Sequence, residues 1–143
     1  MMSNFLTNIE MDSLVETIKT AENNSTGEIR IHIDSNTDDR NAEVAFEVFK
    51  TLCKDKTAEK NAVLFHVNFE QKYLTIIGDE GISRCVDQKF WDVMHDYITA
   101  EFAKGNFYKA LKSSVLKTGI ELKNHFPITG ENPNELPDEI TFS

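Results

Sequence analysis

Oxygen-bearing side chains stand at the borders of three apolar segments of this 143-residue chain. Glu28 precedes an alternating apolar segment, Asn61 precedes a continuous apolar run, and Asp79 follows a third apolar segment. Carboxylate and amide oxygens are the ligands that hard cations such as Ca²⁺ and Mg²⁺ prefer in proteins. If the three segments are neighbouring strands, this spacing predicts a divalent-cation site at one edge of a sheet. Asp87 follows the loop that ends at Gly81 by less than two helical turns and is a fourth candidate ligand.

The same residue types also occur for purely structural reasons. Glu28 is then a solvated strand end, and Asp79 is a turn residue whose carboxylate accepts local backbone hydrogen bonds. The chain has no dense acidic loop, so a cation site here is expected to be weak rather than tight. Both interpretations stay open at the level of sequence.

Apolar periodicity predicts the elements that must position these side chains. A capping box, Thr7-x-x-Glu10, begins a helix that runs to about Asn23. The same helical spacing predicts further helices over about 42–53, from beyond Gly81 to about 102, and from 107 to before Pro127. Strand patterns occupy 28–34, 62–67 and 73–77.

The three strand segments differ in their patterns. Residues 28–34 alternate strictly between isoleucine and polar side chains, which predicts a strand with only one well-buried face. Residues 62–67 are apolar almost throughout, as expected of a strand that is covered on both faces, and a turn then leads into an antiparallel partner at 73–77. His32 and His66 become neighbours on parallel strands, where each is expected as a partly buried, hydrogen-bonded histidine.

The order of elements predicts the α/β class, as a three-layer α/β/α sandwich with a small mixed sheet. Because the first two strands run parallel and the third returns antiparallel, Glu28, Asn61 and Asp79 should meet at one edge. The opposite edge then gathers a second, competing set of polar groups, namely Asp34, Asp38, Asp39, Asn68 and Glu70.

The length and composition of the chain limit its domain organisation, its partners and its location. We expect one domain over residues 1–127, followed by an acidic, extended tail over 128–143. The net charge of −9 argues against nucleic acid and against anionic membrane surfaces as partners. The sequence shows neither a membrane span nor a secretory signal, so we expect a cytoplasmic protein without direct membrane insertion. Cys53 and Cys85 have no C-x-x-C spacing and are expected as reduced thiols.

Four short segments, taken together, resemble the TPM domain family, and in particular its soluble bacterial subgroup. They are Ser25–Ile31, Asn61–Phe65, Ile76–Ile82 and Phe102–Phe107, and their order and spacing extend the resemblance over nearly the whole chain. The resemblance implies an α/β/α sandwich. It also implies binding of calcium or magnesium, which some members show, and phosphatase activity, which is reported for a few.

The chain departs from the family pattern at two places. Relatives often carry Asn-Gly-Val where this chain has Asn61-Ala62-Val63, and Gly-x-Gly where it has Gly78-Asp79-Glu80-Gly81, which adds a pair of carboxylates at a turn. Many relatives also look secreted or membrane-anchored. Family members often occur with LemA-type membrane proteins, which implies a membrane-associated protein partner.

Two functions follow as alternatives. In the first, Glu28, Asn61, Asp79 and Asp87 bind a divalent cation, calcium or magnesium, with metal-dependent phosphatase activity as an extension. No P-loop, GxSxG or Cys-x5-Arg pattern supports a covalent mechanism. In the second, the domain is a non-enzymatic interaction module whose acidic tail engages a membrane-associated partner. We expect a monomer in either case.

Overall fold

A computed structural model describes residues 5–35, 39–128 and 136–143 of the chain. The helices in these residues are α1 (Asn8–Glu22), α2 (Asn41–Leu52), α3 (Glu80–Cys85), α4 (Gln88–Ala103) and α5 (Phe107–His125). The strands are β1 (Glu28–Asp34), β2 (Ala62–Asn68), β3 (Tyr73–Gly78) and β4 (Thr141–Phe142), which form a mixed sheet in the order β3-β2-β1-β4. The predicted α/β class is confirmed.

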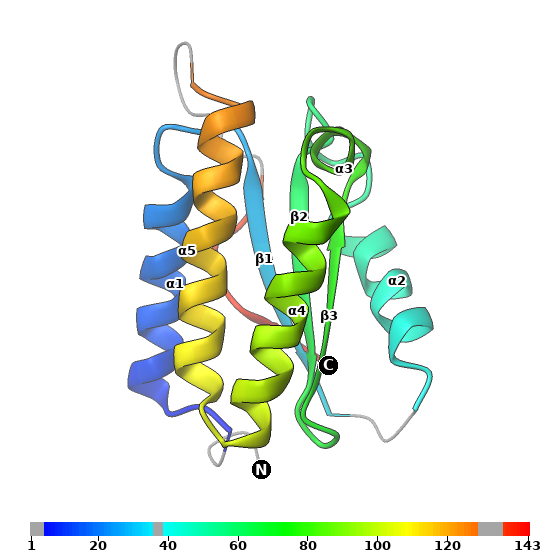
Figure 1. Cartoon of the computed structure of the whole chain (residues 1–143), viewed down its shortest axis with the longest axis vertical. Coiled ribbons are helices and arrows are strands. Elements are labelled where there is room, and N and C mark those ends of the chain that lie inside the picture. Colours follow the sequence, from blue (N-terminus) through cyan, green and yellow to red (C-terminus); the bar gives the residue numbers. More distant parts are fainter. Residues whose placement is uncertain (1–4, 36–38, 129–135) are drawn as a thin grey trace.

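Helices cover both faces of this sheet, as predicted for a three-layer sandwich (Figure 1). The larger core joins α1, α4 and α5 to one face, where Ile29, Ile31 and Phe65 are fully buried. A smaller core on the opposite face packs Phe49 of α2 against Leu64 of β2. Successive strand residues alternate between these two cores, because side chains along a strand point to opposite faces.

The strand pairing agrees with the predicted directions. β1 and β2 are parallel, with Glu28 opposite Ala62 and His32 opposite His66. β2 and β3 are antiparallel, as expected of a hairpin. This register fixes which polar side chains of neighbouring strands share one face of the sheet.

The expectation that β1 has only one buried face is wrong. All seven residues of β1 are buried, including the polar ones that alternate with the isoleucines. The reason is that residues 136–143 return along this strand. Leu136 enters the smaller core, and β4 pairs in parallel with β1 through His32 and Ile33. The segment that was expected as an extended tail therefore supplies an edge strand.

The predicted long helix after Gly81 consists of two helices. α3 already begins at Glu80, and its N-cap is Asp79. Asp87 caps α4, and the chain is extended at Val86 between the two helices. Aspartate is a favoured N-cap because its carboxylate accepts the unpaired N–H groups of a first helical turn. Asp38, which we predicted at the edge with Asp34 and Asp39, lies outside the described residues.

Candidate functional site

The sheet register places three of the predicted ligands at the same end of the sheet. Glu28 lies opposite Ala62 in the parallel pair, and the backbone N–H of Asp79 donates to the Ala62 carbonyl at 2.9 Å. Asn61 directly precedes Ala62, and its carbonyl accepts from the Glu28 N–H at 3.4 Å. All three side chains are buried.

Most polar atoms of these three side chains have partners within the protein, but the buried Asn61 Oδ1 has no hydrogen-bond partner among the described residues. Glu28 Oε1 accepts from the Leu136 N–H at 2.7 Å, and Asn61 Nδ2 donates to Thr26 Oγ1 at 3.1 Å. Asp79 uses both carboxylate oxygens, accepting from the N–H groups of Glu80 and Asp55 at 2.8 and 2.9 Å. These contacts fix the loops at this end of the sheet.

The fourth predicted ligand, Asp87, begins the next helix. Its Oδ1 accepts from the Lys89 N–H at 3.2 Å, as an N-cap residue does. Around this edge, Lys60 Nζ lies 3.6 Å from Asp55 and 3.7 Å from Glu80, so part of the exposed negative charge is already balanced. A cation held by Glu28, Asn61, Asp79 and Asp87 stays a prediction.

A different set of potential ligands converges on the α2 face of the sheet. Within the described residues, three side chains of metal-binding types come together, namely His32, Asp34 and His66. Their ligand atoms all lie within 4.8 Å of one another. All three residues are buried. His66 Nε2 lies 3.3 Å from Asp34 Oδ2, and the two imidazole rings stack at 5.6 Å between their centres.

Simple strand geometry explains this convergence. His32 and Asp34 are two residues apart on β1, so they lie on the same face of the sheet. The parallel register sets His66 directly opposite His32. We name His32, Asp34 and His66 the HDH cluster.

Burial keeps both histidines of the HDH cluster uncharged at neutral pH. Desolvation, with the neighbouring His66, lowers the pKa of His32 to about 4, against the opposing effect of Asp34. Desolvation also lowers the pKa of His66, although its hydrogen bond to the Asp34 carboxylate opposes the shift. A neutral imidazole offers a nitrogen lone pair, which is the form of histidine that binds metals.

Residues of the C-terminal segment close one side of the HDH cluster. His32 Nδ1 lies 2.7 Å from Thr141 Oγ1, and His32 Nε2 lies 2.7 Å from Ser143 Oγ. A cation that binds one of these nitrogens must displace one hydroxyl. The other hydroxyl can then hold the ring in orientation, as the outer hydrogen bonds of metal-binding histidines do.

Sequence reasoning found the two histidines but not the HDH cluster. We predicted His32 and His66 as neighbours on parallel strands, and the register confirms this. Asp34 was instead assigned to the edge with Asp38 and Asp39. The signal that points to the cluster is the spacing of His32 and Asp34, because residues two apart on a strand share a face.

The fold and this site define a three-layer α/β/α domain with a buried histidine and carboxylate cluster. The sequence profile of the TPM domain matches residues 2–119, and the chain belongs to the TPM domain family. The predicted family membership is therefore confirmed.

Two solved structures are similar. The NMR structure of the BA42 protein from the psychrophilic bacterium Bizionia argentinensis superposes with a TM-score of 0.86 at 35% sequence identity, covering 97% of this chain and 96% of that chain. The N-terminal domain of a protein from P. gingivalis gives a TM-score of 0.68 at 16% identity over 89% of this chain and 83% of that chain, which shows the shared fold alone. No curated protein matches the sequence.

No helix in the described ranges combines the length and the apolar character that crossing a membrane requires.

Proposed function

We propose that this TPM domain binds one divalent cation, held by His32, Asp34 and His66. The observation that carries the proposal is the convergence of their three ligand atoms, all within 4.8 Å, from two hydrogen-bonded strands. Rigid strands are good supports for ligands because little conformational freedom remains to be lost on binding.

The ligand types favour one class of cation at the HDH cluster. Two imidazole nitrogens and one carboxylate suit zinc and other first-row transition metals, whereas calcium and magnesium prefer oxygen ligands throughout. Three protein ligands leave a further coordination position open, which is typical of reactive rather than closed structural zinc sites.

Phosphate-ester hydrolysis is a separate proposal that rests on the family resemblance. A divalent cation would supply the Lewis acidity that phosphoryl transfer requires. Here, however, the ligands are buried, and Thr141 and Ser143 cover one side of the HDH cluster. This geometry favours retention of a cation over access of a phosphate ester. Hydrolysis of p-nitrophenyl phosphate, with and without added metal, tests the point directly.

Calcium or magnesium at the opposite end of the sheet is the second candidate. The observation in its favour is that Glu28, Asn61 and Asp79 share that end. The observation against it is that the carboxylates of Glu28 and Asp79 already accept backbone hydrogen bonds, although Asn61 Oδ1 has no such partner in the described residues. Binding there requires a cation to compete with these hydrogen bonds, so we expect it to be weak.

A titration that follows backbone amide shifts separates the two sites. We expect saturable shifts with Zn²⁺ at residues 32–34, 64–68 and 141–143, and these should disappear in His66→Gln but persist in His125→Gln, which alters a partly exposed histidine. Asp34→Asn is a second variant that keeps the shape of the ligand set. Zinc shifts that survive both substitutions would contradict the HDH cluster as the site.

The same titration with Ca²⁺ and Mg²⁺ tests the acidic edge. Saturable shifts at residues 26–28, 60–62 and 78–88 that disappear in Asp79→Asn would support the second candidate. Shifts that follow only the exposed carboxylates, without saturation, would contradict it.

The non-enzymatic interaction module is the alternative proposal. It assigns the acidic C-terminal stretch to a membrane-associated protein partner, with the domain itself monomeric and cytoplasmic. Leu136 and residues 141–143, however, pack against the domain, so the part of this stretch that the structure describes is already engaged. Binding of the membrane-associated protein partner that is unchanged by His66→Gln would favour this alternative.

A further inference from the structure

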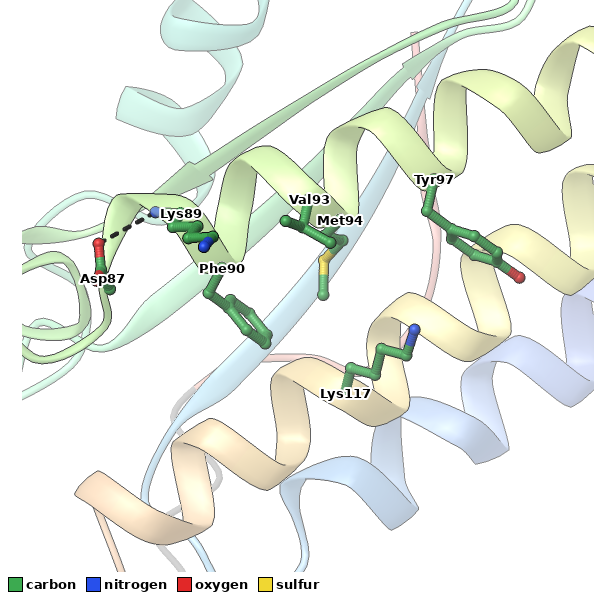
Figure 2. Close-up of a pocket in the computed structure, with 7 residues that line it drawn as sticks. All are labelled: Asp87, Lys89, Phe90, Val93, Met94, Tyr97 and Lys117. Atoms are coloured by element: carbon green, nitrogen blue, oxygen red, sulfur yellow. Dashed lines mark hydrogen bonds between the residues drawn. The ribbon is translucent and has the colours of Figure 1, made fainter.

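A cavity of about 460 Å³ opens between α4 and α5, on the helices that cover the larger core. Figure 2 shows its wall, with Phe90, Met94 and Tyr97 projecting from α4 and Lys117 from α5. The HDH cluster lies on the opposite face of the sheet, with α2. The cavity is therefore separate from the HDH cluster, although Asp87, a candidate ligand at the acidic edge, lies at its border.

The cavity exists because the two helices pack tightly at only one end. Near their connecting loop, the aromatic rings of Phe5, Phe102 and Phe107 fill the space, with ring centres 4.5 to 6.0 Å apart. Towards the beginning of α4 the helices separate (Figure 1). There α5 contributes the small side chain of Thr118, whose hydroxyl contacts Met94 Sδ at 3.8 Å.

The wall is apolar between two positive charges. Val93 is 59% exposed at the mouth, which is high for an apolar side chain beside other apolar groups. Lys89 comes from α4 and Lys117 from α5, and Lys117 Nζ lies over the Tyr97 ring at 4.9 Å. In the described parts of the chain, neither ammonium has a carboxylate within ion-pair distance. Asp87 also lines the cavity, but its carboxylate caps α4.

We propose that this cavity binds an amphiphile with one anionic head group and an apolar body, such as a medium-chain fatty acid. The volume lies within the range of roughly 300–1,000 Å³ that is typical of small-molecule pockets, which are mostly apolar with few polar groups. The two lysines flank the apolar wall from opposite helices, so a carboxylate head can contact one of them while the chain lies on Phe90 and Met94.

Charge complementarity selects this ligand class over a neutral one. The protein has a net charge of −9, which repels anions from most of its surface. The exposed lysine pair beside an apolar wall is a local exception that favours an anionic head group. A neutral alcohol of the same chain length gains the apolar contacts but not this attraction.

The experiment titrates the full chain with decanoate below its micelle concentration and follows backbone amide shifts. We expect saturable shifts at residues 87–97 and 114–118. Lys117→Gln should weaken decanoate binding by about threefold to fivefold, as expected for one exposed charge contact. The matched control is Lys112→Gln on the same helix, because Lys112 lies over the Tyr108 ring at 5.6 Å in a similar contact outside the cavity. This control should bind decanoate as the unchanged protein does.

A second variant tests the apolar wall. Val93→Glu places a negative charge at the mouth on an exposed side chain, so it should leave the fold intact and reduce decanoate binding by about tenfold or more. Decanol should bind more weakly than decanoate, and Lys117→Gln should not alter its affinity.

Any one of the following outcomes overturns the proposal. The first is the absence of saturable shifts at these residues. The second is equal weakening by Lys117→Gln and Lys112→Gln, or equal binding of decanol and decanoate. The third is that shifts at residues 87–97 follow protein concentration instead of decanoate, which would assign this wall to contact between two copies of the chain. Each outcome is independent of cation binding at the HDH cluster.

Discussion

His32 Nε2 lies 2.7 Å from Ser143 Oγ, which joins two residues that are 111 positions apart in the chain. The other ring nitrogen of His32 lies 2.7 Å from Thr141 Oγ1. Both nitrogens of one buried imidazole are thus engaged by the segment that forms β4. The side-chain contacts of His32 therefore stabilise the position of this short edge strand beside β1, in addition to the backbone pairing.

Removing this imidazole should loosen β4. In His32→Ala, two hydroxyl contacts are lost and a buried cavity is left, so we expect the free energy of unfolding to fall by about 2–4 kcal/mol. Urea denaturation measures this change. The Ser143 amide, which donates to the Ile33 carbonyl, should also exchange faster with deuterium.

His125→Ala is the control for that substitution, because His125 is partly exposed near the end of α5. It should change stability by less than about 0.5 kcal/mol. If the Ser143 amide exchanges at the same rate in both variants, His32 does not hold β4.

Stability should fall in mildly acidic solution because of His32. Its pKa is lowered to about 4 in the folded protein, from 6.5, so protons bind preferentially to the unfolded chain. The stabilisation is complete above pH 6.5 and is lost as the pH falls towards 4, by up to about 3 kcal/mol. Urea denaturation between pH 7.5 and pH 4 measures it.

His32→Gln should reduce this dependence on pH without abolishing it, since burial also lowers the pKa of His66. An unchanged slope of stability against pH in His32→Gln would assign the acid sensitivity to other groups.

Ionisation of Glu22 should lower the stability of the protein as the pH rises, which is the opposite pH dependence to that of His32. Burial, together with Asp138 and Glu28, raises the pKa of Glu22 to about 10, although the hydrogen bond from the Ile29 N–H at 2.7 Å opposes this shift. Its proton is bound more tightly in the folded protein, so stability is complete below pH 4.5 and declines as the pH rises towards 10. Glu22→Gln keeps an acceptor for Ile29 and should flatten this decline.

Denaturation curves at pH 6 and pH 9 test the Glu22 prediction. The control is Glu16→Gln, whose side chain is 73% exposed on the same helix. It should leave the difference between the two curves unchanged. Equal slopes for Glu22→Gln and the unchanged protein would show that Glu22 is ionised when folded.

The two cysteines should differ sharply in reactivity. Cys53 is fully buried, and burial raises the pKa of its thiol to about 12, whereas Cys85 is exposed. Only the thiolate reacts, so a disulfide reagent at pH 8 should modify one thiol in the folded protein and two in denaturant. Cys85→Ser should abolish the fast reaction. A fast reaction that remains in Cys85→Ser would contradict the buried position of Cys53.

Local sequence patterns account for most of the fold. The Thr7 and Glu10 capping box is present at the start of α1, and the alternation in residues 28–34 correctly separates the two faces of β1. What the patterns did not reveal depends on distant contacts. β4 contains two residues in an acidic, proline-containing stretch, and contacts with β1 hold it in place.

Less of the candidate site than of the fold could be predicted from the sequence. The register predicted that Glu28, Asn61 and Asp79 share one end of the sheet, but not that Asp55 and Leu136 would approach the carboxylates of Asp79 and Glu28. Predicting the HDH cluster requires both the parallel register of β1 and β2 and the face of the sheet to which each side chain points. Spacing within a strand gives the face, but only tertiary pairing gives the register.

The parallel pairing of β4 with β1 also has a consequence for the order in which the protein is made. Residues 28–34 leave the ribosome early, but their partner Thr141 follows 109 residues after His32. During synthesis this side of β1 therefore stays open, with backbone groups and four buried polar side chains lacking their final cover. The nascent domain can pair β1 with β2 and β3 first, and the sheet is completed only after residue 143 has emerged.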